Sequence, residues 1–196
     1  MAICITTNVV CLAGGCFCQT SDGIEFTGGT STANQFIDCT TSPEQGSVSG
    51  YTSGGYAPAS DTIDKFPFTS DTNATDVGNL TASKHGVAGQ SSSTSGYTSG
   101  GGTPPTAGAG LDVIEKFPFA SDSNATDVAE MTEGRCDPGG NSSSTSGYNS
   151  GGQRCGGYGV PGFRDIIDKF PFASDGASSD VGNLLTAQLC TGGGGQ

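Results

Sequence analysis

An eight-residue segment occurs three times in the chain, and this repetition constrains the fold more than any other feature of the sequence. It reads DKFPFTSD at 64–71, EKFPFASD at 115–122 and DKFPFASD at 168–175. The successive copies are 51 and 53 residues apart. A period of this length is typical of one supersecondary unit, so we expect the chain to fold as a repeat array.

The same two motifs flank each copy. A GYxSGG segment with a Ser before it precedes each copy at 49–55, 95–101 and 146–152, and a segment related to NATDV follows it at 73–77, 124–128 and 177–181. Fainter copies occur at both ends, where Gly-Gly pairs begin at 14 and 192. We therefore predict a degenerate, Cys-rich first repeat over 1–49, three further repeats over 50–95, 96–146 and 147–187, and a closing strand with a Gly-rich tail over 188–196.

The residue types favour strands and turns. Val, Ile, Phe, Tyr and Thr dominate the short runs, while Gly, Pro, Asn, Asp and Ser fill the gaps between them. No window shows sustained helical periodicity, and 34 Gly with 9 Pro would interrupt a helix. Because Pro cannot donate to a strand ladder, each KFPF strand is expected to end or bulge near its Pro. The sequence predicts an all-β fold.

The period and motif order favour one class of β repeat. Leucine-rich repeats are shorter, WD40 repeats carry a Trp-Asp pair that this Trp-free chain lacks, and kelch blades run to about 50 residues. The order LTASKHG, GYTSGG, TIDKFPF resembles the kelch pattern of a polar segment with a basic residue, a strand ending in Gly-Gly, and an apolar strand with an aromatic. Kelch repeats usually add a Tyr and a Trp after the glycines, whereas here Phe66 or Phe68 is the nearest substitute and the Trp is missing.

The resemblance implies a kelch-like β-propeller, or a partial propeller, of about four blade-like repeats. Over 49–185 the chain is also similar to GYxSGG/KFPF repeat proteins of marine bacteriophages, especially those of cyanobacteria. Only 33% of the residues are hydrophobic, so each repeat is expected to share its buried face with its neighbours. The expected core between blades consists of the repeated phenylalanines Phe66, Phe68, Phe117, Phe119, Phe170 and Phe172.

The number of repeats is compatible with two ways of arranging the blades. There are five Gly-Gly strands, one more than four blades need. A closed monomeric ring and an open arc completed by another chain are equally compatible with this count, because the edges of an open arc invite pairing. We expect a homo-oligomer.

Eight cysteines, an even number in a Gly-rich chain, indicate disulfides and an oxidising final environment. The candidates are Cys4, Cys11, Cys16, Cys18, Cys39, Cys136, Cys155 and Cys190. Cys136 and Cys155 flank one GYxSGG segment and are placed to clip a blade, and Cys190 could tie the chain end to the N-terminal cluster. Zinc at Cys11, Cys16 and Cys18 is disfavoured because the usual paired spacing is not repeated.

The charge narrows the range of partners. The net charge of −12 argues against nucleic acid and anionic membranes, because binding to phosphate needs Lys and Arg, which total 7 here. The sequence contains no run of about 20 apolar residues, as a membrane-spanning helix would need, so we predict no membrane insertion. The N-terminal apolar stretch lacks a positively charged segment before it, so we expect synthesis in a host cytoplasm without a signal peptide.

Catalytic chemistry is not expected, because the single His85 excludes any site that needs two histidines, including the copper site of kelch-type oxidases. Calcium has a weak case in two turns where hard oxygens alternate, formed by Asp71, Asn73, Asp76, Asp122, Asn124 and Asp127. Turn chemistry explains the same residues without an ion. We therefore predict no catalytic residue and no cofactor.

The sequence and its resemblance together lead to one functional hypothesis. We expect a virion structural or adhesive protein of a bacteriophage, in a tail, fibre or capsid decoration, that contacts other virion proteins or a host surface glycan. The contacts are expected in the variable loops that carry Tyr56, Pro58, Pro104, Pro105 and Tyr158. The alternative is a free extracellular carbohydrate-binding module.

Overall fold

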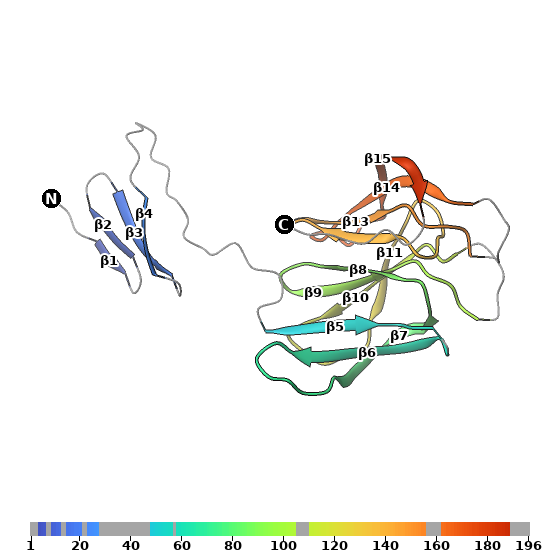
Figure 1. Ribbon diagram of the computed structural model, residues 1–196, viewed down its shortest axis with the longest axis horizontal. Coiled ribbons are helices and arrows are strands. Elements are labelled where there is room, and N and C mark those ends of the chain that lie inside the picture. The colour runs from blue at the N-terminus through green and yellow to red at the C-terminus, as the bar shows by residue number, and fades with distance from the viewer. Residues whose placement is uncertain are drawn as a thin grey trace. The chain divides into compact units, whose positions relative to one another are not determined.

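The computed structural model contains two compact units, Met1–Glu44 and Gln45–Gln196 (Figure 1). It describes residues 4–6, 9–12, 15–20, 23–27, 48–56, 58–104, 110–155 and 162–188. All regular structure in these ranges is β, which confirms the predicted all-β fold. The same ranges contain no helix long and apolar enough to cross a membrane.

The first unit contains a four-stranded antiparallel sheet. Its strands pair in chain order: β1 (Cys4–Thr6), β2 (Val9–Leu12), β3 (Gly15–Thr20) and β4 (Gly23–Thr27). This sheet falls within the predicted Cys-rich repeat 1–49.

The second unit contains three antiparallel sheets, and each is a meander of consecutive strands. The first sheet comprises β5 (Ser49–Ser53), β6 (Ser60–Pro67) and β7 (Thr75–Lys84). The second comprises β8 (Ala88–Ser91), β9 (Ser95–Ser99), β10 (Val113–Pro118) and β11 (Thr126–Glu130). The third comprises β12 (Gly139–Ser142), β13 (Ser146–Ser150), β14 (Arg164–Pro171) and β15 (Ser179–Gln188). Figure 1 shows the second sheet between the other two.

Each repeated motif forms the same strand in every sheet of this unit. GYxSGG supplies β5, β9 and β13, and the KFP segment ends β6, β10 and β14 at its proline, as expected from the missing N–H. The register is also repeated, since Tyr51 pairs with Lys65 and Tyr97 with Lys116. The three sheets are therefore copies of one unit, although β5–β7 has one strand fewer.

The glycine of each GY pair makes room for an aromatic ring on the neighbouring strand. Gly96 lies opposite Phe117, and a Cβ on Gly96 would lie 2.2 Å from the ring. Gly147 has the same relation to Phe170, also at 2.2 Å. The Gly and the Phe of the repeat are thus one packing unit.

Two apolar clusters lie between the sheets. Ile63 and Leu80 of the first sheet pack with Phe117 and Ala125 of the second. Tyr97, Ile114, Ala129 and Met131 of the second sheet pack with Phe170 and Phe172 of the third. Of the six phenylalanines expected in the core, Phe68 differs most, because 53% of it is exposed.

Candidate functional site

The two faces of each sheet carry different residues of the repeat, because alternate strand residues point to opposite sides. We call one side the entry face; in the second sheet it carries Glu115, Phe117 and Phe119. The other side, the exit face, carries Tyr97 and Lys116 there, with Ile114 beside them. The exit face of one sheet packs on the entry face of the next, and we call each such contact a junction.

An aromatic clamp forms the centre of both junctions. The Tyr51 ring lies 5.5 Å from Phe117 and 4.9 Å from Phe119. Tyr97 repeats these contacts with Phe170 at 5.5 Å and Phe172 at 4.9 Å. Pairs of this geometry contribute about 0.5–1.5 kcal/mol beyond the area they bury.

A lysine extends each clamp toward solvent. Lys116 Nζ lies 5.8 Å from the centre of the Tyr97 ring and 3.0 Å from Asp175 of the next sheet. Lys65 repeats the arrangement with Tyr51 at 5.9 Å and Asp122 at 3.1 Å. The hydrogen bonds to Asp175 and Asp122 raise the pKa of Lys116 and Lys65 respectively, while burial raises the pKa of Tyr97.

A buried acid on the entry face completes the junction between the first and second sheets. Glu115 has no exposed surface and accepts hydrogen bonds from the backbone N–H of Thr81, at 2.8 Å, and from its hydroxyl. Lys84 Nζ lies 2.9 Å from the second oxygen of the same carboxylate. All three partners come from β7.

Asp168 has the same role between the second and third sheets. It accepts from the Thr132 hydroxyl at 2.7 Å and forms an ion pair with Arg135 at 2.5 Å. Both Asp168 and Arg135 are fully buried. Burial lowers the pKa of Arg135, and the attraction of Asp168 opposes this effect. These pairs were not predicted from the sequence, although their residues recur in it. An acid stands directly before each KFP segment, and a basic residue follows Asp64 and Glu115 after 20 positions.

An open hollow of about 220 Å³ lies at the outer edge of the second junction. It is lined by Tyr97, Lys116, Phe172 and Ala173 together with two hydroxyl-rich turns, which contribute Ser92, Ser93 and Thr94 and then Ser144 and Thr145. The lysine is already held by Asp175, and no histidine lines the hollow. This arrangement suits polar contact better than nucleophilic chemistry.

The residues considered for calcium have other contacts. Asp122 is paired with Lys65, and Asn124 accepts a hydrogen bond from the backbone N–H of Asn79, in β7, at 3.0 Å. Asp76 accepts from the N–H of Gly78 at 3.1 Å, as turn chemistry predicts. Among the residues that the structure describes, no three His, Cys, Asp or Glu side chains form a metal-binding group. The remaining candidates, Asp71, Asn73 and Asp127, are exposed.

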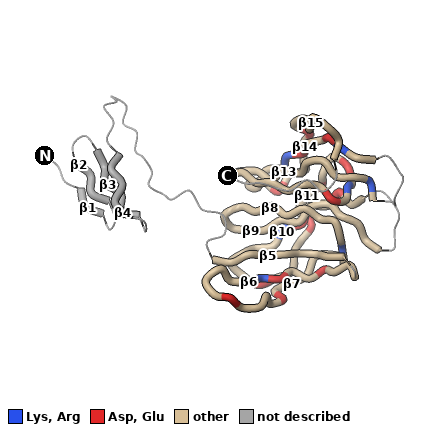
Figure 2. The backbone as a smooth tube through the Cα atoms, viewed as in Figure 1, with Lys and Arg blue, Asp and Glu red and all other residues tan. Residues whose placement is uncertain are grey.

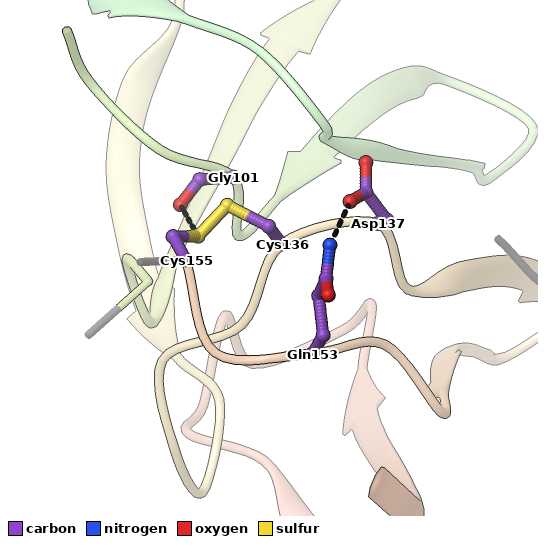
Figure 3. Close-up of a disulfide and its surroundings, with 5 residues drawn as sticks. All are labelled: Gly101, Cys136, Asp137, Gln153 and Cys155. Atoms are coloured by element: carbon purple, nitrogen blue, oxygen red, sulfur yellow. Dashed lines mark hydrogen bonds between the residues drawn. A yellow bond between two sulfur atoms is a disulfide. The ribbon is translucent and has the colours of Figure 1, made fainter. Parts of the chain in front are cut away.

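One predicted disulfide is present. Cys136 is bonded to Cys155, and the sulfur of Cys155 lies 3.5 Å from the carbonyl oxygen of Gly101, in the Gly-Gly segment that follows β9. Nearby, Gln153 donates a hydrogen bond to Asp137 at 3.0 Å (Figure 3). The bond therefore fastens the two ends of the β12–β13 hairpin beside the second sheet. Cys39 and Cys190 lie outside the described residues, and for Cys4, Cys11, Cys16 and Cys18 only the backbone is described.

The remaining sequence candidates lie near the Gly-Gly ends of the strands. His85 forms a backbone bridge with Gly102, and its ring centre lies 5.1 Å from that of Tyr56. Tyr56 itself is 81% exposed, and Pro58 and Pro104 are exposed. Pro105 and Tyr158 lie outside the described residues.

Comparison with known proteins finds distant similarity among solved structures. No family model matches the chain, and no curated protein matches it. Among solved structures, a fungal alcohol oxidase of the AA5 family, in complex with copper, is similar with a TM-score of 0.49 and 10% identity. The similarity covers 66% of this chain and 29% of the oxidase, so the chain spans less than a third of that protein. Similarity at this level carries no argument about activity.

Proposed function

We propose that the three sheets of the second unit are successive blades of a kelch-like partial propeller, and that the chain acts by surface contact. The observation that carries this proposal is the repeated junction. Its acids, bases and aromatics pair with the neighbouring sheet, so the charged and aromatic groups of the repeat serve stacking. Contact with other molecules is therefore expected at the exposed loops, at the entry face of the first sheet and at the exit face of the third sheet.

The kind of assembly rests on the sequence resemblance to bacteriophage repeat proteins. On that basis the protein is a structural or adhesive component of a virion, in a tail, fibre or capsid decoration, made in a host cytoplasm. Its partners are other virion proteins or a host surface glycan. Asp and Glu outnumber Lys and Arg, 19 to 7, and the acidic and basic positions of the described chain are marked in Figure 2. A net negative charge keeps such a protein soluble and disfavours binding to nucleic acid.

Mass spectrometry of purified particles, digested without reduction, tests this proposal. We expect peptides of the chain at a fixed ratio to the main structural proteins, including a linked peptide pair that contains Cys136 and Cys155. Absence of the chain from the particles would contradict the virion assignment.

A carbohydrate-binding module is the second candidate, and the exposed Tyr56 favours it. Exposed aromatic rings are the usual stacking surface for sugars, and 81% of Tyr56 is accessible. Binding of the isolated protein to a glycan array, lost in Tyr56→Ala and kept in Phe163→Ala, would support this function over the structural one.

A further inference from the structure

The two ends of the second unit are unpaired halves of the same junction. The entry face of the first sheet carries Phe66, Phe68 and the acid Asp64, in the positions of Phe170, Phe172 and Asp168. The exit face of the third sheet carries Tyr148 and Lys169, in the positions of Tyr97 and Lys116. In Figure 1 these two sheets lie on opposite sides of the second sheet.

Exposure of the end residues shows that the described strands of the second unit leave both halves uncovered. Phe68 is 53% exposed, whereas its counterpart Phe172 is 9% exposed. On β15, Val181 is 51% exposed and Leu185 is fully exposed, whereas their counterparts on β7, Val77 and Thr81, contact the second sheet. Three of the six large apolar residues most exposed in the described chain therefore belong to these two faces.

The charges of the two ends are complementary. Lys169 lies 5.9 Å from the Tyr148 ring, as the other two lysines do with their tyrosines. In the described part of the chain it has no carboxylate partner like Asp122 or Asp175. The equivalent acid of the first sheet is Asp71, which forms no ion pair with any described residue. Each end thus carries the charge that the other lacks.

We propose that the exit face of the third sheet binds the entry face of the first sheet in a second copy of this chain. Tyr148 would then stack on Phe66 and Phe68 of the other copy, and Lys169 would pair with its Asp71. The contact is head-to-tail, so it either closes a ring of two copies or continues into a longer assembly. This inference rests on the junction geometry alone and holds whether or not the protein belongs to a virion.

The chain's own N-terminal segment lacks the residues that the entry face needs. Residues 1–47 contain no Tyr, Lys or Arg, so they cannot supply the tyrosine and the basic side chain that each junction places on Phe-x-Phe and Asp. The third sheet supplies both, in the register of the two internal junctions. A second copy is therefore the better match for this face.

The contact between copies differs from the internal junctions at one point. Where the other sheets present Thr81 with Lys84, or Thr132 with Arg135, β15 presents Leu185 with Gln188. Asp64 would meet a neutral amide rather than a cation. We therefore expect the contact between copies to be weaker than the internal ones and to be reversible on dilution.

Association of the full chain, measured by sedimentation velocity and light scattering over a range of concentrations, tests the proposal. The wild type should show a mass that rises above the 19.4 kDa of one chain with concentration. Phe68→Ala should weaken association at least tenfold, because it removes a central aromatic anchor. Phe163→Ala, which removes a ring of similar exposure (50%) that has no counterpart in the internal junctions, is the matched control and should change association less than twofold.

A charge exchange identifies the two faces directly. Lys169→Glu and Asp71→Lys should each weaken self-association about tenfold, because each places like charges across the contact. An equimolar mixture of the two variants should regain wild-type association, because every contact in a mixed assembly again joins opposite charges. Circular dichroism should show that both variants are folded.

Three outcomes would overturn the proposal. The wild type could remain a single chain at every concentration, or the charge variants could fail to complement each other. In the third outcome, Phe68→Ala leaves the mass unchanged but makes residues 1–47 easier to cleave with protease. The last result would assign the entry face to the chain's own N-terminal segment.

Discussion

Asp168 and Arg135 illustrate how single residues hold this fold together. Both are fully buried at the second junction, where their attraction offsets the cost of removing two charges from water. Lys65 and Asp122 also form an ion pair between neighbouring sheets, but their side chains are 31% and 58% exposed. The two pairs should therefore differ strongly in what they contribute to stability.

Removing one partner of each pair tests this difference. Asp168→Asn leaves the Arg135 guanidinium buried without a counter-charge, so we expect a loss of about 3–5 kcal/mol in the free energy of unfolding. Asp122→Asn should cost about 0–1 kcal/mol, as is usual for exposed pairs. Urea unfolding followed by tyrosine fluorescence measures both, since all five tyrosines lie between residues 51 and 158. Equal losses in the two variants would contradict the assignment.

Tyr97 and Lys116 predict how stability depends on pH. Burial raises the pKa of Tyr97, and the hydrogen bond to Asp175 raises the pKa of Lys116. A group whose pKa is higher in the folded state stabilises the fold below its unfolded pKa, which is about 10 for Tyr and about 10.4 for Lys. This contribution is lost as the pH rises through the folded pKa.

We therefore expect the free energy of unfolding to fall steeply above about pH 10. Tyr97→Phe removes one of the groups whose pKa is raised and should flatten the fall, whereas Tyr56→Phe, at an exposed position, should leave it unchanged. Urea titrations at pH 8, 10 and 11 give the slopes. Identical slopes for the wild type and Tyr97→Phe would show that Tyr97 does not carry the effect.

At the scale of the strand, the pairing of Gly96 with Phe117 explains why the repeat keeps both residues. Gly96→Ala places a methyl group 2.2 Å from the Phe117 ring, closer than any real contact allows. We expect a loss of about 1–3 kcal/mol, typical of overpacking. Gly89→Ala in the neighbouring strand β8 is the control, because its Cβ would have no neighbour within 4 Å.

For Gly89→Ala we expect no loss, and a gain of up to about 1 kcal/mol from the stiffer unfolded chain. Thermal unfolding of both variants gives the comparison. A harmless Gly96→Ala would show that the Phe117 ring moves freely, and the link between the GY and KFPF motifs would then fail.

The elements were largely predictable from local pattern, whereas their contacts were not. The strands, their ends at proline and the Cys136–Cys155 bond follow from residue types and spacing that can be read within one repeat. The roles of Tyr97 and Glu115 could not be read that way, because their partners lie one repeat away, across a junction. The same holds for Ile114 and Phe117. Both faces of the second sheet are covered, so these two residues point to opposite sides and both are buried.

At the scale of the whole second unit, stability should follow the order of the sheets. Residues of the first sheet contact the second, and those of the second contact the third, through separate sets of side chains. Stacked repeats of this kind behave approximately as a sum of unit and nearest-neighbour energies. The two junctions should therefore contribute independently, even though they share the strands of the second sheet.

A double-mutant comparison tests this independence. Glu115→Gln weakens the first junction by leaving Lys84 unpaired, and Asp168→Asn does the same to Arg135 at the second. Because the two acids share no partner, the losses should add to within about 0.5 kcal/mol. The matched pair is Arg135→Met with Asp168→Asn, which removes both charges of the buried ion pair. The loss in this double variant should be smaller than the sum of the two single losses by well over about 1 kcal/mol, because the double variant leaves no buried charge without a partner.

Urea unfolding of the three single and two double variants gives all five losses. A coupling above about 1 kcal/mol between Glu115→Gln and Asp168→Asn would mean that the three sheets share one cooperative core instead of stacking pairwise.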